Sequence, residues 1–148
     1  MARKLKVYIA APWRERKYAQ KTAQRFRDAG FEVTSRWLSE HLDKADSVDA
    51  AAPEVMRAEA LHDIEDVVNA DLFVLLNTQA RGEETSGKAV ETGVAIMTFK
   101  GIILVGERTN VFHWLEFPVV GTVEEAIETA KDYPWQPDQA PNLEETIH

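Results

Sequence analysis

The chain has 148 residues, of which 45% are hydrophobic and 28% are charged, and its formal net charge is −8. This length and composition are typical of one globular domain. The negative charge argues against nucleic acid as a partner, and no apolar run is long enough for a membrane span. The absence of cysteine excludes disulfides and a thiolate nucleophile and fits the cytoplasm, and four scattered histidines favour no metal site.

The first third of the chain predicts a strand, a helix and a second strand. Residues 5–10 (LKVYIA) have the apolar, β-forming character of a buried parallel strand. A helical pattern follows from Trp13 to the capping residue Gly30 and predicts one buried face, made of Ala19, Thr22, Ala23 and Phe26. Residues 31–34 then resume as a strand, and such a βαβ unit connects parallel strands.

The middle of the chain predicts an irregular segment, a helix and the central strand. Residues 35–52 lack periodicity and contain Trp37, so we expect a loop with at most a helical turn that walls a pocket. Pro53 occupies the first position of a helix that runs to Asn69. Its inward face is predicted from the apolar spacing as Leu61, Ile64, Val67 and Val68. Residues 71–77 are apolar enough for a central strand.

The last third of the chain predicts a helix, two strands and a final helix, followed by a tail. Thr85, Ser86 and Gly87 predict the helix start, and the helix continues to about Phe99. Lys100 and Gly101 close it before a strand at residues 102–105, and a weak strand follows near residues 117–120. Thr122 begins the last helix, with a capping-box spacing to Glu125. We assign residues 1–132 to one domain and residues 133–148 to an extended or partly disordered tail.

The alternation of strands and helices predicts a doubly wound α/β fold. Five strands favour a parallel, flavodoxin-like sheet of order 2-1-3-4-5 with helices on both faces. Ligands bind such sheets at the carboxyl ends of strands 1 and 3. Ala10, Trp13 and Arg14 follow the first of these strands, and residues 77–87 follow the other. Glu91 comes within the next turn and a half of helix and is therefore expected near the crevice.

Glu91 is the most informative residue of this crevice. It is the only carboxylate in its helix and has small neighbours that leave room for a ligand. The helix N-terminus is expected to favour its ionised form, although a solvated helical glutamate is the alternative. The sequence lacks the phosphate-loop, dinucleotide, nucleophile-elbow and zinc-protease motifs. The remaining carboxylates, hydroxyls and aromatic side chains suit glycosidic-bond chemistry.

Three motifs in order resemble the nucleoside 2-deoxyribosyltransferase family, a superfamily that includes the 2'-deoxynucleoside 5'-phosphate N-hydrolases. They are residues 7–12 (VYIAAP), residues 63–65 (DIE) continuing to residues 70–74 (ADLFV), and the pattern Gly87-x-x-x-Glu91-x-Gly93-x-Ala95. The resemblance implies an enzyme of the N-glycosidic bond with Glu91 as the nucleophile on C1′. It implies further that Asp63 holds the sugar or the base, and that Tyr8 hydrogen-bonds the nucleophile. No metal and no organic cofactor is implied.

Each of these roles has a structural alternative. Tyr8 can be a packed strand residue, Asp63 a surface acid, and Trp37 either a wall of the base pocket or a cover for the sheet edge. The roles of Asn110 and His113 are open, with a structural or interface role favoured for His113. The expected substrate-binding residues are Ala10, Trp13, Arg14, Trp37, Thr85, Ser86, Gly87 and Asn110.

The resemblance leaves three functions open. Base exchange between 2'-deoxynucleosides is the leading one. Hydrolysis of 2'-deoxynucleoside 5'-monophosphates is favoured by Thr85, six residues before Glu91 at an anion-binding helix start, with Arg14 and Lys88 as further charges. Against hydrolysis, this chain has Ala11 and Pro12 at the positions where the resembling hydrolases have Gly-Ser. One hydroxyl expected to bind the phosphate is therefore missing here. A nucleotide-binding domain without chemistry is the third possibility.

The family's pockets are completed across a subunit interface, so the resemblance implies a homodimer or larger homo-oligomer. Aromatic residues without an obvious place in a small core are candidate interface anchors: Trp114, Phe117, Tyr133 and Trp135. We also expect Asp63 and Glu91 to titrate as a pair, with one pKa raised and the other lowered.

Overall fold

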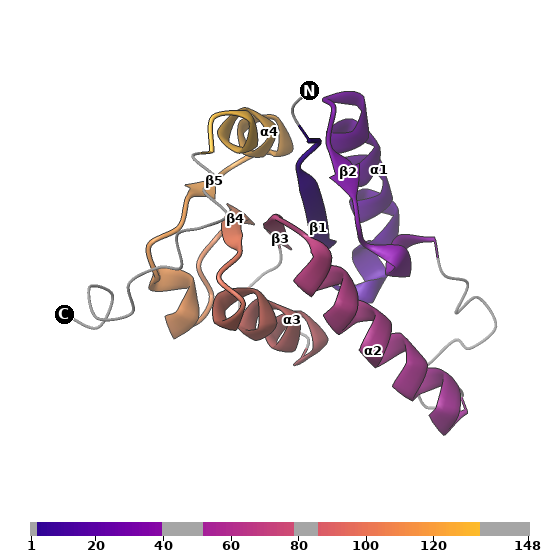
Figure 1. Ribbon diagram of the computed structural model, residues 1–148. Helices are drawn as coiled ribbons and strands as arrows, with labels where there is room; N and C mark the ends of the chain where they lie inside the picture. The colour runs from indigo at the N-terminus through magenta and orange to yellow at the C-terminus, as the bar shows by residue number, and fades with distance from the viewer. Residues whose placement is uncertain (1–2, 40–51, 79–85, 134–148) are drawn as a thin grey trace.

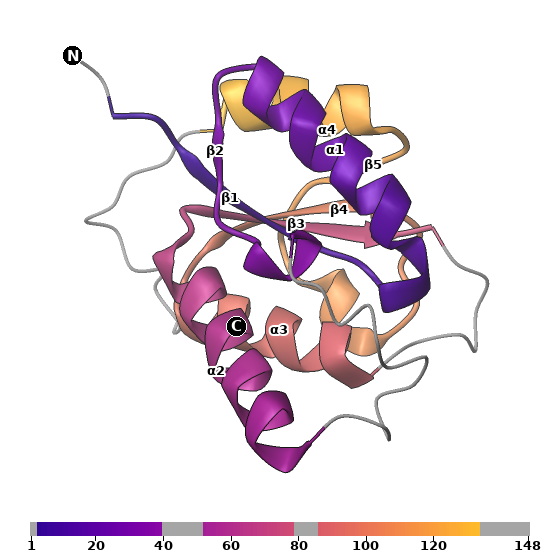
Figure 2. The same ribbon diagram turned by 90° about the vertical axis from the view of Figure 1, so that its right-hand side faces the viewer.

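The five strands of the protein form one parallel sheet in the order β2-β1-β3-β4-β5, which confirms the predicted doubly wound topology. The computed structural model describes residues 3–39, 52–78 and 86–133. The strands are β1 (Lys6–Ala10), β2 (Glu32–Val33), β3 (Leu72–Asn77), β4 (Gly101–Gly106) and β5 (Val119–Val120). Figures 1 and 2 show α1 (Arg16–Asp28) and α4 (Val123–Lys131) on one face, and α2 (Pro53–Asn69) and α3 (Ser86–Met97) on the other.

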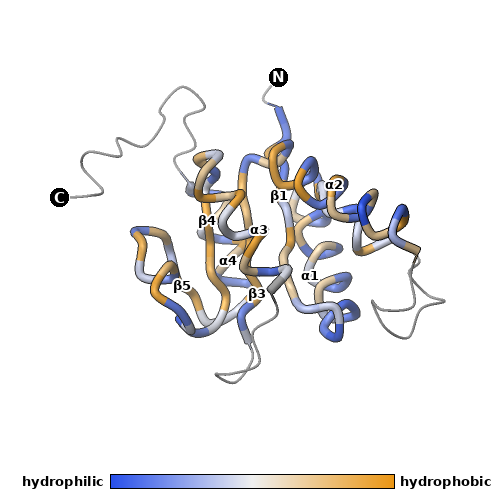
Figure 3. The backbone as a smooth tube through the Cα atoms, turned by 90° about the horizontal axis from the view of Figure 1, so that it is seen from below, coloured by the Kyte–Doolittle hydropathy of each residue, from blue (hydrophilic) through white to orange (hydrophobic). Residues whose placement is uncertain are grey.

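The core lies along the three central strands. Every residue of β3 is buried, and its register places Tyr8 of β1 beside Phe73 and Val74 beside Ile103 of β4. Figure 3 shows the apolar colour along β4, whereas α1 alternates between apolar and polar turns. The winding reverses between β1 and β3, so the loops after these two strands diverge at the carboxyl edge of the sheet. This is the edge at which the sequence analysis expects the ligand.

The first helix matches its sequence pattern. A short 3₁₀ turn, η1 (Trp13–Glu15), leads into α1, whose buried residues are the four that were predicted, Ala19, Thr22, Ala23 and Phe26. Gly30 follows the helix with φ of +99°, a conformation that glycine adopts without a steric penalty. The segment after β2 forms one further 3₁₀ turn, η2 (Arg36–Leu38).

The second helix has the predicted bounds but a different buried face. Val67 is buried as expected, and its neighbour Asp66 is buried with it. The prediction that Leu61, Ile64 and Val68 face inward is wrong, because they are 60%, 42% and 43% exposed. The buried residues of α2, Asp66 and Val67, lie on a different face of the helix from these three, and Figure 1 shows that the first half of α2 extends beyond the sheet. These three side chains form an apolar stripe on the surface.

The remaining elements complete the sheet. Helix α3 ends before Lys100 and Gly101, as expected; Phe99 is left-handed there, with φ of 58°, and Gly101 is the first residue of β4. The turn η4 (Val111–Trp114) follows β4, and Thr122 caps α4 by accepting a hydrogen bond from the Glu125 N–H at 3.2 Å, as predicted. Tyr133, which the sequence assigned to the tail, packs against the core, and residues 134–148 lie outside the described residues. None of the described helices has the length and apolar character needed to cross a bilayer.

Candidate active site

Three elements bring acidic and phenolic groups together on the α2–α3 face of the sheet. Tyr8 comes from β1, Asp63 from α2 and Glu91 from α3. The Tyr8 hydroxyl donates a hydrogen bond to Glu91 Oε1 at 3.0 Å, the contact that the resemblance led us to expect. The Tyr8 ring is fully buried and stacks on Phe73, with centroids 5.6 Å apart and planes within 4°. Packing of the ring therefore fixes the direction in which the hydroxyl points.

Glu91 is held in a setting that favours its neutral form. Burial is the main cause that raises its pKa to about 8, and the nearby charge of Asp63 adds to the rise. The hydrogen bond from Tyr8 opposes both effects because it stabilises the carboxylate. The expectation that the helix start keeps Glu91 ionised is therefore wrong for the described chain. Glu91 is the sixth residue of α3, and the dipole effect fades beyond the first turn.

Asp63 is the second perturbed acid. Its Oδ1 atom is buried and has no hydrogen-bond partner among the described residues. Burial, followed by the charges of Glu59 and Asp66, raises the pKa of Asp63 to about 6, against lowering by His62 and Arg36. The expected pattern of one raised and one lowered pKa is thus wrong, since both values rise. Burial acts on both carboxyl groups, and Asp63 also has other acids beside it.

Two tryptophans form a corner at the carboxyl end of β1, which we call the tryptophan corner (Trp13 and Trp37). Trp37 is buried and its indole N–H donates to the carbonyl oxygen of Ile9 at 2.9 Å. Trp13 is 45% exposed, its ring centroid is 6.3 Å from that of Trp37, and the planes are inclined by 45°. The guanidinium carbon of Arg16 lies 4.7 Å from the Trp13 ring centroid. Trp37 thus covers the end of β1 and also supports an exposed aromatic surface.

The other predicted residues are distributed around the same edge. Ala10 is buried at the end of β1, and Arg14 is exposed in η1. Ser86 and Gly87 begin α3, and apart from its chain neighbours and the backbone of its own helix, no atom of the described residues lies within 4 Å of the position that a Gly87 Cβ would occupy. Thr85 lies outside the described residues.

Asn110 and His113 belong to a different part of the edge. Asn110 caps η4 by accepting a hydrogen bond from the Phe112 N–H at 2.9 Å. It also lines an apolar pocket of about 210 Å³ between α3 and η4, whose lining does not include Tyr8, Asp63 or Glu91. His113 is buried, and its Nδ1 accepts a hydrogen bond from the Thr109 N–H at 3.0 Å. These contacts describe a histidine that shapes the loop after β4.

The sequence reasoning missed two buried polar residues. Asn77, at the end of β3, accepts a hydrogen bond from Lys88 Nζ at 2.6 Å and donates to the Glu107 carbonyl and to Thr109 Oγ1. Lys88 is only 5% exposed, so its ammonium joins α3 to this strand end. Asp66 is the other, and its carboxylate accepts hydrogen bonds from Arg36. A polar residue that ends an apolar strand was an available signal for Asn77.

Comparisons with known proteins agree with this architecture. The sequence profile described as nucleoside 2-deoxyribosyltransferase matches residues 7–133. Among curated proteins, none matches the chain by sequence. Among solved structures, a 2-deoxyribosyltransferase from Bacillus psychrosaccharolyticus superposes with a TM-score of 0.63 at 19% identity, covering 82% of this chain and 90% of that one.

Two further structures share the fold. The CMP N-glycosidase BcmB of Clostridium botulinum gives a TM-score of 0.55 at 17% identity over 86% of this chain and 99% of its own. A conserved protein from Enterococcus faecalis gives 0.63 at 18% identity, with coverage of 88% and 99%. With the profile match over most of its length, the chain belongs to the nucleoside 2-deoxyribosyltransferase family. That membership supports an enzyme of glycosyl transfer or N-glycosidic cleavage.

Proposed function

We propose that this protein cleaves the N-glycosidic bond of 2'-deoxynucleosides and transfers the deoxyribosyl group to a second base. The observation that carries the proposal is the hydrogen bond from the buried Tyr8 side chain to Glu91, beside a second acid, Asp63, whose Oδ1 atom is buried. A nucleophilic carboxylate must be ionised, correctly directed and shielded from water. Tyr8 serves the first two needs, because its hydrogen bond opposes the rise in the Glu91 pKa and directs one oxygen, which leaves the other for the substrate.

The proposed reaction has two displacement steps. One oxygen of ionised Glu91 attacks C1′ of the deoxyribose, the bond from C1′ to the base nitrogen breaks, and its electron pair leaves with the base. The resulting ester joins C1′ to Glu91. The ring nitrogen of a second base then attacks C1′ and restores the carboxylate. Attack by water at the second step gives hydrolysis, and no metal or organic cofactor enters either step.

The proton for the departing base is assigned to the pair of acids. With pKa values of about 8 for Glu91 and about 6 for Asp63, the pair retains close to one proton near neutral pH. The higher pKa places this proton mainly on Glu91, so the proposed reactive form is the less populated one, in which Glu91 is the carboxylate and Asp63 holds the proton. Asp63 then passes the proton to the base, which leaves poorly as an anion. The Oδ1 of Asp63, which has no hydrogen-bond partner among the described residues, is the proposed acceptor of a hydrogen bond from substrate. The tryptophan corner is the proposed stacking wall for the base.

A substrate panel tests this proposal. Wild-type protein and Glu91→Ala are incubated with each 2'-deoxynucleoside, with and without a second free base, and with each 5'-monophosphate, and the released base is quantified by chromatography. We expect base exchange by the wild type and a loss of at least about a thousandfold in Glu91→Ala. Glu128→Ala, which changes an exposed helical glutamate of α4, is the matched control.

The other outcomes of the panel are also decisive. Base release from monophosphates alone identifies a 2'-deoxynucleoside 5'-monophosphate N-hydrolase. Thermal stabilisation by a nucleotide that is never cleaved identifies a binding domain without chemistry. Undiminished base release by Glu91→Ala contradicts the assignment of Glu91.

We also propose a homodimer or larger homo-oligomer. Met97 and Trp114 are 73% and 71% exposed on α3 and η4, and Val90 and Phe112 lie on the same two elements beside the 210 Å³ pocket. Contiguous apolar surface of this kind supports a protein interface. Trp114 is thus exposed as a candidate anchor, whereas Phe117 and Tyr133 pack on the core and Trp135 lies outside the described residues. Light scattering at micromolar concentration tests this, and a fully active monomer contradicts it.

A further inference from the structure

We infer that Asp66, a residue of α2 with no contact to the reacting atoms in the proposed function, positions the tryptophan corner against which the base stacks. This inference rests on the proposed function and adds a positioning residue to it. Asp66 is 4% exposed. Its Oδ2 accepts a hydrogen bond from the Arg36 backbone N–H at 2.9 Å, and its Oδ1 accepts one from Arg36 Nε at 2.8 Å. One carboxylate therefore fixes both the main chain and the side chain of the residue before Trp37.

The backbone of Asp66 makes a further contact, with the residue that precedes Ser35. Its own carbonyl oxygen accepts a hydrogen bond from Thr34 Oγ1 at 2.9 Å. Thr34 and Arg36 are the two neighbours of Ser35, so the segment entering η2 is tied to α2 at two consecutive points. The turn η2 has only three residues and no regular ladder of its own. Asp66 thus ties the start of η2 to α2, while Gln20 of α1 holds its end by donating from Nε2 to the Leu38 carbonyl at 2.6 Å.

Side chains of this segment, which runs into η2, hydrogen-bond the backbone near the end of β1. Ser35 Oγ accepts a hydrogen bond from the Ile9 N–H at 2.6 Å, and the Trp37 indole donates to the Ile9 carbonyl at 2.9 Å. Both polar groups of one peptide residue are therefore satisfied by side chains of the η2 segment. Ile9 directly follows Tyr8, which bonds Glu91. The same contacts thus connect the aromatic corner with the strand that carries the phenol.

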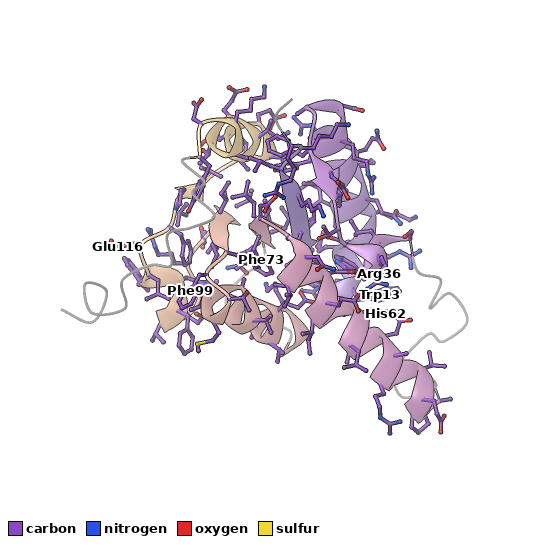
Figure 4. The ribbon with its side chains drawn as sticks, viewed as in Figure 1. Trp13, Arg36, His62, Phe73, Phe99 and Glu116 are labelled. Carbon is purple, nitrogen blue, oxygen red and sulfur yellow. The ribbon has the colours of Figure 1, made fainter. Side chains whose placement is uncertain are left out.

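A carboxylate suits position 66 because the two Arg36 atoms that contact it, the backbone nitrogen and Nε, are both hydrogen-bond donors. An asparagine offers one acceptor oxygen and one donating NH₂ group, so one of the two hydrogen bonds is replaced by opposed donors. The loss of a partly buried, charge-assisted pair is expected to loosen η2 and let the Trp37 ring move. Misplacement by about 1 Å is sufficient to weaken binding of a stacked base. Figure 4 labels Trp13 and Arg36, which lie on the same side of the molecule.

Asp71 provides a matched control. It too is a buried aspartate, and its carboxylate accepts hydrogen bonds from one backbone N–H, that of Lys6 at 2.9 Å, and from the guanidinium of Arg3 at 3.0 Å. It differs in place, since it precedes β3 at the amino end of the sheet, away from the crevice. Asp71→Asn and Asp66→Asn therefore remove the same kind of buried clamp at opposite ends of the sheet.

The experiment compares these two variants with the wild type in three measurements. They are base-exchange kinetics from about pH 5 to about pH 9, nucleoside binding by tryptophan quenching, and the near-ultraviolet circular dichroism of the tryptophans. For Asp66→Asn we expect KM and the nucleoside Kd to rise about tenfold or more, with kcat within about threefold and the tryptophan dichroism reduced. Asp66→Asn also removes a negative charge that raises the pKa of Asp63. A change caused by that charge varies with pH, whereas a change caused by displaced tryptophans is present at every pH, so the pH series separates the two. Asp71→Asn is expected to lose similar thermal stability but to keep KM, Kd and dichroism.

Equal KM, Kd and dichroism in the two variants would overturn the inference. If Asp66→Asn does not fold, Arg36→Ala replaces it, because this change removes the Nε contact and leaves the backbone contact; the same direction of change is expected. Failure of the proposed function is distinguishable, since a wild type that binds nucleosides without cleaving them still reports the Kd and the dichroism. An Asp66→Glu variant, which restores two acceptor oxygens, is expected to recover part of the KM.

Discussion

The hydroxyl of Tyr8 and the carboxylate of Glu91 are joined by a 3.0 Å hydrogen bond although 83 positions separate them in the sequence. The tyrosine approaches from the middle of the sheet and the glutamate from a helix that covers it. Because the phenol is stacked on Phe73, it donates in one fixed direction. The relationship gives Glu91 a permanent partner that favours its ionised form in a setting where burial opposes ionisation.

Tyr8→Phe is expected to move the acidic limb of the pH–rate profile to higher pH. The change keeps the stacked ring but removes the hydrogen bond that lowers the pKa of Glu91. The rate near neutral pH is expected to fall about 10- to 100-fold, because a charge-assisted hydrogen bond contributes about 1.5–3 kcal/mol. Profiles of kcat/KM for the two proteins check this, and coincident acidic limbs would assign Tyr8 to packing alone.

Asp63→Asn is expected to shift the same limb in the opposite direction. The charge of Asp63 raises the pKa of Glu91, so its removal lets Glu91 ionise at lower pH. The maximal rate is nevertheless expected to fall about 10- to 100-fold, because the departing base loses its proton source. Glu54→Gln is the control, since this exposed acid lies in the first turn of the same helix. An unchanged rate and profile in Asp63→Asn would place Asp63 on a solvated helix face.

Glu91→Gln is expected to stabilise the protein at alkaline pH relative to the wild type. The folded-state pKa of Glu91, about 8, lies above its ordinary value of 4.5, so the native state binds more protons than the unfolded state between these values. The wild-type free energy of unfolding therefore falls as pH rises through this window, by on the order of a few kcal/mol. Urea denaturation at several pH values checks the difference between the two proteins. Parallel stability curves for wild type and variant would mean that Glu91 is not desolvated.

Two glycine substitutions are expected to have opposite effects on stability. Gly106 has φ of +117°, and an added Cβ would lie 2.2 Å from the Asn77 carbonyl oxygen, so Gly106→Ala is expected to cost more than about 2 kcal/mol. A Cβ at Gly93, inside α3, meets no atom within 4 Å, so Gly93→Ala is expected to gain about 0.5–1 kcal/mol. Thermal unfolding of both variants checks the signs. A Gly106→Ala protein as stable as the wild type would show that the junction of β3 and β4 adapts.

The positions of most helices and strands could be predicted, because caps, prolines and apolar runs in the sequence mark where each element begins and ends. Pro53 fixed the start of α2, Thr122 the start of α4, and the apolar run ending at Asn77 the central strand. The orientation of Leu61 and Ile64 failed for a non-local reason, since periodicity defines an apolar face but not whether a strand lies beneath it. The candidate nucleophile was found through its apolar setting and the family motif.

The polar contacts around the site could not be predicted, because they join segments that are far apart in the sequence and residue spacing does not give the distances between them. The part played by Asp66 becomes visible only when α2 meets η2, across 30 positions of sequence. The direction of the Glu91 pKa was mispredicted in the same way. Helix position is a local property, whereas the burial that dominates the pKa is set by the whole fold.

The two outer strands of the sheet are only two residues long, Glu32–Val33 in β2 and Val119–Val120 in β5. A long free edge offers a row of unpaired backbone groups on which another chain can continue the sheet. Here each edge offers so few that growth by strand addition, including amyloid-like stacking, has almost no template. In the proposed oligomer, the described part of the chain therefore offers side chains rather than strand edges for contacts between copies, and single substitutions tune such contacts without altering the backbone hydrogen bonding of the sheet.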